Sequence, residues 1–146
     1  MLKRGLTLIE LLVVIAIIGL LASILLVGSS RAKARAYDAR IITAMNQIRT
    51  RAQIIYQENG DYAKVGCTKV EDPCECKDPA KEIEVICTDI VRNAVPGTVV
   101  FSVGGQAYCI KAQLPGTRKF WCIDSNLNSK EYDDPPCSPA NRKCTP

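Results

Sequence analysis

The chain has 146 residues, 23% of them charged, with a formal net charge of +4. This length allows one small domain plus a terminal segment, and the charge is too small to indicate a nucleic-acid partner by itself. The sequence has no histidine, which removes the commonest general base and metal ligand. No catalytic residue is predicted, and we expect no enzymatic activity.

An apolar run dominates the N-terminal part of the chain. The run from Leu6 to Val27 has 22 residues, and Glu10 is its only charged side chain. As a helix it would cover about 33 Å, against about 30 Å for the hydrocarbon core of a bilayer. Placing a carboxylate there costs about 2.5–3.5 kcal/mol, so an ionisable residue in such a run indicates a function. If the chain is cut after Gly5, the free amine of Leu6 is the candidate partner of Glu10.

The stretch Lys3-Arg4-Gly5-Leu6-Thr7-Leu8-Ile9-Glu10 and the apolar residues after it resemble the class III signal peptide of type IV pilins and type II secretion pseudopilins. The shared features are a short basic leader, a glycine before the cut, a Thr-Leu-Ile-Glu core and a long apolar helix. One difference is that the first mature residue is most often Phe in the family. The resemblance implies that a prepilin peptidase cuts between Gly5 and Leu6 and that a methyltransferase modifies the Leu6 amine. It also implies that Glu10 pairs with the Leu6 amine of the next subunit, although spacing alone leaves pairing within one helix open.

The helix is expected to continue beyond the apolar run with one apolar stripe, formed by Ile41, Met45, Ile48, Ala52 and Ile55. Asn59-Gly60-Asp61 is a typical helix end. Gly19 lies in the first half of the helix. It favours either local unwinding, as the family resemblance implies, or close helix packing.

Basic residues follow the apolar run at Arg31, Lys33, Arg35 and Arg40. They are expected to be solvated near the membrane or paired with acidic groups of a neighbouring subunit. DNA and anionic lipid headgroups are the alternatives.

We expect four parts: a leader at 1–5, a transmembrane or filament-core helix at 6–28, the amphipathic half of the same helix at 29–59, and a disulfide-rich globular head at 60–146. The resemblance implies an α+β, pilin-like fold. In the head, Asp78-Pro79 predicts the start of a short helix, along which Ile83, Ile86, Ile90 and Ala94 follow at helical spacing, with a strand at 82–85 as the alternative. Three strands at 98–103, 107–113 and 118–123 predict an antiparallel meander.

All eight cysteines lie between Cys67 and Cys144, a density that favours disulfides and an oxidising compartment. A hairpin centred on Pro115-Gly116 would place Cys109 opposite Cys122, which predicts that they form a disulfide. Cys137 and Cys144 either close a small loop or tie the C-terminal tail to the sheet. The pairing of Cys67, Cys74, Cys76 and Cys87 is left open. A metal site at Cys74-Glu75-Cys76 is disfavoured because the paired spacing of zinc ligands is absent.

Asp124, Asn126 and Asn128 place oxygen atoms at alternate positions, as at the start of a calcium loop. Major pseudopilins carry a calcium site in their C-terminal loops. Ser129, however, replaces the glycine of an EF-hand, and an Asn/Asp-rich turn is the favoured interpretation. We therefore expect no cofactor, with calcium as the alternative.

The sequence predicts a structural subunit of a type IV pilus-like filament that assembles from copies of itself through its N-terminal helix. Its expected partners are the prepilin peptidase and methyltransferase, the assembly machinery, and the inner membrane before assembly. The head is expected outside the cytoplasmic membrane in the precursor and on the cell surface in the filament. The alternatives are a pseudopilin of a type II secretion-type machine and a membrane-anchored binding module that does not polymerise. A nucleic-acid partner is not favoured.

Overall fold

The structure is a computed structural model that describes residues 7–76 and 81–145, the side chains of residues 24–28 excepted. The chain forms the long helix α1 (Leu8–Asn59) and a short 3-10 helix (Ala63–Val65). It continues with the strands β1 (Cys67–Lys69) and β2 (Glu75–Cys76), the helix α2 (Lys81–Asn93), and the strands β3 (Val100–Val103), β4 (Tyr108–Gln113), β5 (Phe120–Asp124) and β6 (Ser129–Tyr132). This confirms the predicted α+β class. The chain divides into two compact units, Met1–Lys33 and Ala34–Pro146, and we call the second the head unit.

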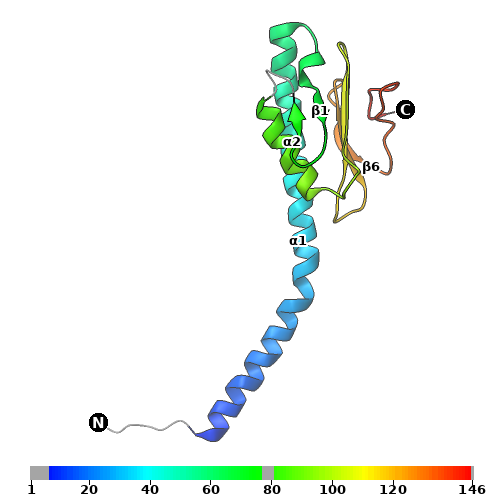
Figure 1. The fold of residues 1–146 in the computed structure, drawn as a ribbon. Coiled ribbons are helices and arrows are strands. Elements are labelled where there is room, and N and C mark those ends of the chain that lie inside the picture. The colour runs from blue at the N-terminus through cyan, green and yellow to red at the C-terminus, as the bar shows by residue number, and fades with distance from the viewer. Residues whose placement is uncertain (1–6, 77–80, 146) are drawn as a thin grey trace. The chain divides into compact units, whose positions relative to one another are not determined.

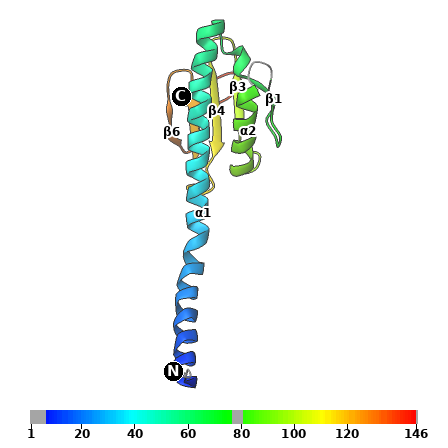
Figure 2. The same cartoon turned by 90° about the vertical axis from the view of Figure 1, so that its left-hand side faces the viewer.

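The head unit consists of layers built on a four-stranded antiparallel sheet of order β3-β4-β5-β6. The C-terminal half of α1 and the helix α2 lie on one side of this sheet (Figures 1 and 2). The segment after β6 lies on the other side (Figure 1). The sheet therefore has two covered faces, one under helices and one under an irregular segment.

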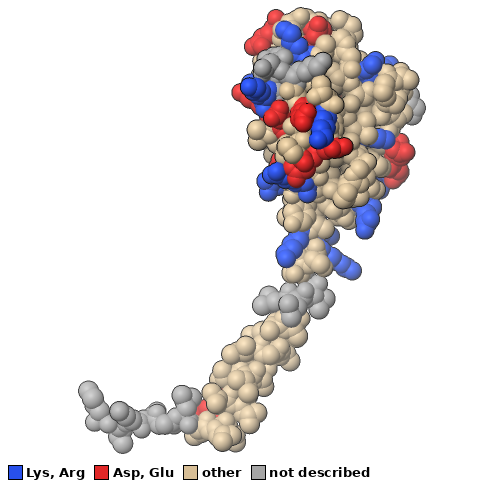
Figure 3. All heavy atoms as spheres, viewed as in Figure 1, with Lys and Arg blue, Asp and Glu red and all other residues tan. Residues whose placement is uncertain are grey.

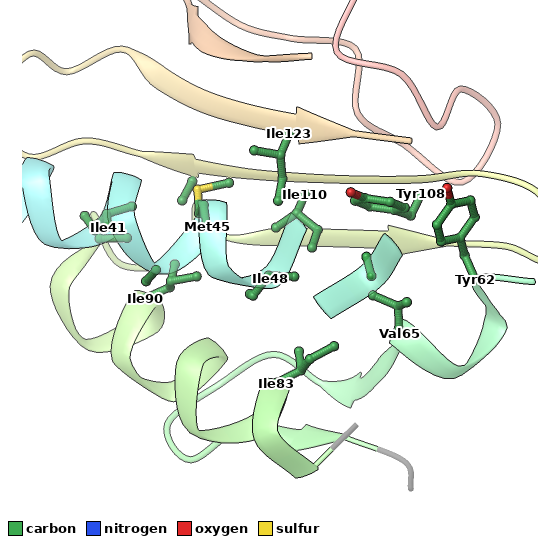
Figure 4. Close-up of a cluster of buried hydrophobic side chains, with 14 of the residues drawn as sticks. Ile41, Met45, Ile48, Tyr62, Val65, Ile83, Ile90, Tyr108, Ile110 and Ile123 are labelled. Atoms are coloured by element: carbon green, nitrogen blue, oxygen red, sulfur yellow. The ribbon is translucent and has the colours of Figure 1, made fainter. Parts of the chain in front are cut away.

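The core lies between the helices and the sheet (Figure 4). Ile41, Met45, Ile48 and Ala52 of α1 are all fully buried, and Ile55 is 7% exposed. Steps of four and three residues place these side chains on one face of a helix, which confirms the predicted stripe. They pack with residues of α2 and the sheet that are also buried, namely Ile83, Ile90, Tyr108, Ile110, Ala112 and Ile123.

The end of α1 follows its predicted signal. The helix ends at Asn59, and Gly60 adopts a φ of 76°, the left-handed conformation that glycine reaches without strain. Tyr62 follows and packs against Tyr108 of β4, with 5.0 Å between the ring centroids. This contact fixes the return of the chain toward the sheet.

The second helix is confirmed, and the alternative of a strand at 82–85 is wrong. α2 buries Ile83, Cys87 and Ile90 on one face. The predicted start at Asp78-Pro79 lies outside the described residues. The segment before α2 contains the short antiparallel pair of β1 and β2, which we did not predict.

The sheet has one strand more than predicted, because β6 pairs with β5. The predicted register of β4 and β5 is also wrong by two residues. Cys109 lies opposite Asp124, and Cys122 lies opposite Lys111. The turn is longer than a hairpin centred on Pro115-Gly116, since Leu114 N–H donates to Lys119 O at 2.8 Å and Arg118 adopts a φ of 64°.

The predicted disulfide between Cys109 and Cys122 is therefore wrong. Cys109 bonds to Cys137 and Cys122 bonds to Cys144, with Cα–Cα distances of 5.7 and 5.8 Å. Because these strand positions point away from the helices, both disulfides tie the C-terminal segment to the outer sheet face. The alternative in which Cys137 and Cys144 close a small loop is also wrong.

The four remaining cysteines form a second pair of disulfides. The Cys67–Cys76 bond joins β1 to β2, and the Cys74–Cys87 bond ties this strand pair to α2. All eight cysteines are thus paired, as the expectation of a disulfide-rich head requires.

Candidate functional site

The start of α1 is apolar around its whole circumference. Large apolar side chains are exposed at nearly every position from Leu8 (79% exposed) through Ile15 (60%) to Leu21 (54%). Successive residues point about 100° apart around a helix, so no polar face remains. The visible face of this stretch is almost free of charged side chains (Figure 3). A helix that is apolar on every side needs apolar surroundings, which are other helices or lipid.

Within the part of the chain that the structure describes, no helical segment is both long enough and apolar enough to cross a membrane. The transmembrane or filament-core segment expected at residues 6–28 stays a prediction.

Glu10 caps the first turn of α1. Its Oε2 accepts hydrogen bonds from the backbone N–H and the hydroxyl of Thr7, both at 2.9 Å. In return, the Glu10 N–H donates to Thr7 Oγ1 at 3.3 Å. This reciprocal arrangement is a capping box, in which a Thr and a Glu three residues later satisfy free N–H groups of a helix start. Our sequence analysis missed this role, although the Thr-x-x-Glu spacing of Thr7 and Glu10 signals it.

The cap leaves part of the Glu10 carboxylate available. Among the described residues, only Thr7 donates to it, and both bonds reach Oε2. Oε1 can therefore accept an N–H from a further group while the cap stays intact. The predicted partner, the amine of Leu6, and the predicted cut between Gly5 and Leu6 lie outside the described residues.

Basic side chains follow the apolar stretch (Figure 3). Arg31, Lys33 and Arg35 are all exposed, and we call these three residues the basic segment. Arg40 differs because it pairs with Asp89 of α2 at 2.6 Å, and the hydrogen bond between them raises the pKa of Arg40. All four basic residues are exposed, but only Arg40 forms an ion pair among the described residues, and this pair joins α1 to α2.

A cleft of about 420 Å³ lies between α1 and α2, lined among others by Arg40, Ala44, Gln47, Asp89 and Arg92. Its charged side chains already have partners. Arg40 pairs with Asp89, and Arg92 pairs at 2.9 Å with Asp72 of the segment between β1 and β2. These ion pairs hold elements of the head unit together.

The loop with the calcium candidates forms a hydrogen-bonded turn. Asp124 is fully buried. Its Oδ1 accepts the backbone N–H groups of Asn126 and Asn128, at 2.9 and 3.1 Å. Its Oδ2 accepts the Asn128 side-chain amide at 2.9 Å and the Cys144 N–H at 2.8 Å. Both oxygens thus accept N–H groups, as in the Asn/Asp-rich turn that we favoured. Calcium binding by Asp124, Asn126 and Asn128 stays an untested hypothesis.

Three cysteine sulfur atoms also lie close together in the head unit. The Sγ atoms of Cys67, Cys76 and Cys87 are within 4.8 Å of one another. Each is part of a disulfide, so none offers the thiolate that a metal site requires. The cluster is a pair of neighbouring disulfides.

Comparison with known proteins gives a match at the N-terminal end of the chain. Residues 1–26 match the family model of the prokaryotic N-terminal methylation motif. No curated protein and no solved structure matches the chain. The matched residues include Gly5, Leu6, the Thr7–Glu10 cap and most of the apolar stretch. The chain therefore carries the class III signal peptide motif of type IV pilins and pseudopilins.

Proposed function

We propose that this protein is the structural subunit of a type IV pilus-like filament, assembled from copies of itself through α1. The observation that carries the proposal is that α1 is apolar on every side from Leu8 to Leu21. The one carboxylate of this stretch, Glu10, lies in its first turn. In a bundle of such helices every side of α1 is buried against a neighbour, so no polar face is needed. The motif at residues 1–26 supports the same assignment.

The motif supports the following assembly sequence. A prepilin peptidase cuts between Gly5 and Leu6, and a methyltransferase modifies the new amine. The precursor is anchored in the inner membrane with its head outside. The assembled filament lies at the cell surface, where the head unit forms the exposed layer.

Glu10 has two roles in this proposal. Its Oε2 caps its own helix through Thr7. Its Oε1 accepts the Leu6 amine of the next copy. Two opposite charges 4 Å apart attract by about 4 kcal/mol at an effective dielectric constant of 20. This attraction offsets the cost of about 2.5–3.5 kcal/mol for placing the carboxylate in apolar surroundings. Burial of Glu10 is therefore favourable only in contact with a neighbour.

Two substitutions separate the cap from the charge. Glu10→Gln keeps a side chain that can cap the helix but removes the negative charge, since capping boxes accept Glu or Gln. Thr7→Ala removes the cap, at a cost of about 1 kcal/mol, and keeps the charge. We expect Glu10→Gln to abolish surface filaments in electron micrographs and Thr7→Ala to retain them. Filaments formed by Glu10→Gln at the normal level would contradict the pairing.

Mass spectrometry of purified filaments tests the processing step. The expected subunit begins at Leu6 with a methylated amine. A filament whose main subunit still begins at Met1 would refute the proposal.

A pseudopilin of a secretion machine and a membrane-anchored binding module are the alternatives. A pseudopilin shares the motif but forms a short, membrane-bound assembly, so surface filaments distinguish it from a pilus subunit. In a module that does not polymerise, Glu10→Gln would leave both assembly state and location unchanged.

A further inference from the structure

We propose that the basic segment, Arg31, Lys33 and Arg35, binds the headgroups of anionic phospholipids while the precursor is anchored in the membrane. This inference rests on the membrane-anchored precursor of the proposed function. It adds a partner chemistry that anchoring alone does not require, because an apolar helix inserts into neutral and anionic bilayers alike.

The first support is the exposed charge of the segment. From Leu11 to Tyr37 the sequence has no Asp or Glu, so nothing along this stretch neutralises the three cations. No carboxylate of the described residues forms an ion pair with them. The next carboxylate, Asp38, is buried, and its Oδ1 accepts the N–H of Gly116 at 2.8 Å. The segment thus presents a net charge of +3 to its surroundings.

The second support is the position of the segment along α1. Arg31 follows Glu10 by 21 residues of continuous helix, which is about 32 Å at 1.5 Å per residue. The hydrocarbon core of a bilayer is about 30 Å thick. When Glu10 lies at one interface, the basic segment therefore lies at the headgroups of the other. Tyr37, 46% exposed, follows at the level where tyrosine is enriched in membrane proteins.

The third support is the spread of the charges around the helix. Lys33 points about 200° from Arg31, and Arg35 points about 40° from it. The cations therefore occupy opposite sides of α1. A single protein or nucleic-acid surface contacts one side of a helix, whereas lipid headgroups surround it. This distribution favours a membrane surface as the partner.

The expected effect follows from the number of cations. Each Lys or Arg near an anionic membrane surface increases binding about fivefold, so three increase it about a hundredfold. Salt screens the attraction, since the Debye length falls from about 10 Å at 0.1 M to about 3 Å at 1 M.

A competition between two vesicle populations tests the inference. Detergent-solubilised full-length protein is offered equal amounts of neutral phosphatidylcholine vesicles and vesicles with phosphatidylglycerol, which are then separated by density. At low salt the wild type is expected to favour the anionic vesicles by about a hundredfold. The triple variant Arg31→Gln, Lys33→Gln, Arg35→Gln is expected to distribute about equally. High salt during insertion is expected to reduce the preference of the wild type.

The matched control removes three exposed cations of the head unit, in the variant Arg118→Gln, Lys119→Gln, Lys130→Gln. It has the same net charge as the test variant and is expected to keep the wild-type preference. An equal loss in both variants would show that net charge, not the basic segment, determines the preference and would overturn the inference.

The remaining outcomes separate this inference from the proposed function. Insertion of the wild type into both vesicle types without preference would refute lipid recognition and leave the anchor intact. Failure to insert into either type would refute the membrane-anchored precursor and the inference with it. Loss of filaments in the triple variant, without any lipid preference of the wild type, would assign the basic segment to a neighbouring subunit instead.

Discussion

Replacing Gly116 by Ala is expected to destabilise the head unit, and the same replacement is expected to be harmless once Asp38 has been removed. Gly116 lies in the turn between β4 and β5, and its N–H donates to the buried carboxylate of Asp38 on α1 at 2.8 Å. A β-carbon on Gly116 would overlap Oδ2 of Asp38, and its three nearest atoms all belong to that carboxylate. When Gly116 gains a side chain, the Asp38 carboxylate must turn away or the turn must move from the helix, and either change breaks the hydrogen bond.

The magnitude follows from the hydrogen bond that is lost. A hydrogen bond to a charged group contributes about 1.5–3 kcal/mol, so Gly116→Ala and Asp38→Ala are each expected to cost about 2 kcal/mol. In the Asp38→Ala background the added β-carbon meets no carboxylate. There Gly116→Ala is expected to stabilise by about 0.4–1 kcal/mol, because Ala restricts the unfolded chain more than Gly. The expected coupling energy is therefore about 2–3 kcal/mol.

Urea unfolding of the oxidised full-length protein in detergent measures these free energies, with the fluorescence of Trp121, the only tryptophan, as the signal. Gly105→Ala is the matched control, because no atom lies within 4 Å of a β-carbon at that position in the turn between β3 and β4. The reasoning is refuted if the two substitutions are additive within about 0.5 kcal/mol, since additivity marks sites that do not interact.

Three further outcomes are expected from contacts in the head unit. Asp124→Ala removes the acceptor of the turn N–H groups and should cost about 3 kcal/mol in urea unfolding, and a loss below about 1 kcal/mol would contradict its structural role. Replacing Cys122 and Cys144 by Ser opens a disulfide with a sequence separation of 22 and should cost about 3 kcal/mol. It should also expose the C-terminal segment to limited proteolysis. An unchanged cleavage pattern would show that this disulfide does not hold the segment on the sheet. Hydrogen bonds from Arg92 lower the pKa of Asp72 below its ordinary value of 3.8. This stabilisation is present above pH 3.8 and is lost as the pH falls through the lowered pKa. Arg92→Gln should therefore be less stable than wild type at pH 6, and the difference should shrink as the pH falls below 3.8. A difference that stays constant from pH 6 into acid would contradict the pairing.

Periodicity predicted the second half of α1 and the helix α2 because their buried side chains repeat at helical spacing. Ile41, Met45 and Ile48 repeat at helical spacing, and all three are fully buried in the structure. The end at Asn59-Gly60 was also predictable, since only a residue without a side chain takes the left-handed conformation at no cost. Local signals of this kind need no knowledge of the rest of the fold.

The sheet register and the disulfides could not be predicted in this way. The positive φ of Arg118 lengthens the turn between β4 and β5, and no glycine marks the position. This shift separates Cys109 from Cys122 and leaves both for partners in the C-terminal segment. β6 was missed because its sequence, Ser129 to Tyr132, is polar, which reflects its place at the edge of the sheet.

The sequence predicted the motif that contains Glu10, but it predicted the contacts of the Glu10 carboxylate only in part. The cost of a carboxylate in an apolar run pointed to Glu10 and led us to a charged partner. The structure adds that Thr7 already binds one oxygen of this carboxylate. Glu10, which we explained by its charge, thus also stabilises the first turn of the helix. The substitutions Glu10→Gln and Thr7→Ala separate these two roles.

The disulfides of the C-terminal segment have a consequence for how the surface of this protein can evolve. Cys137 and Cys144 fasten both ends of the segment between them to neighbouring strands. Two covalent bonds thus hold the ends of this segment in place. Replacements there alter the exposed chemistry of the head while the fold beneath is retained. Related proteins with the same two disulfides can therefore vary this part of their surface while the sheet beneath it is kept.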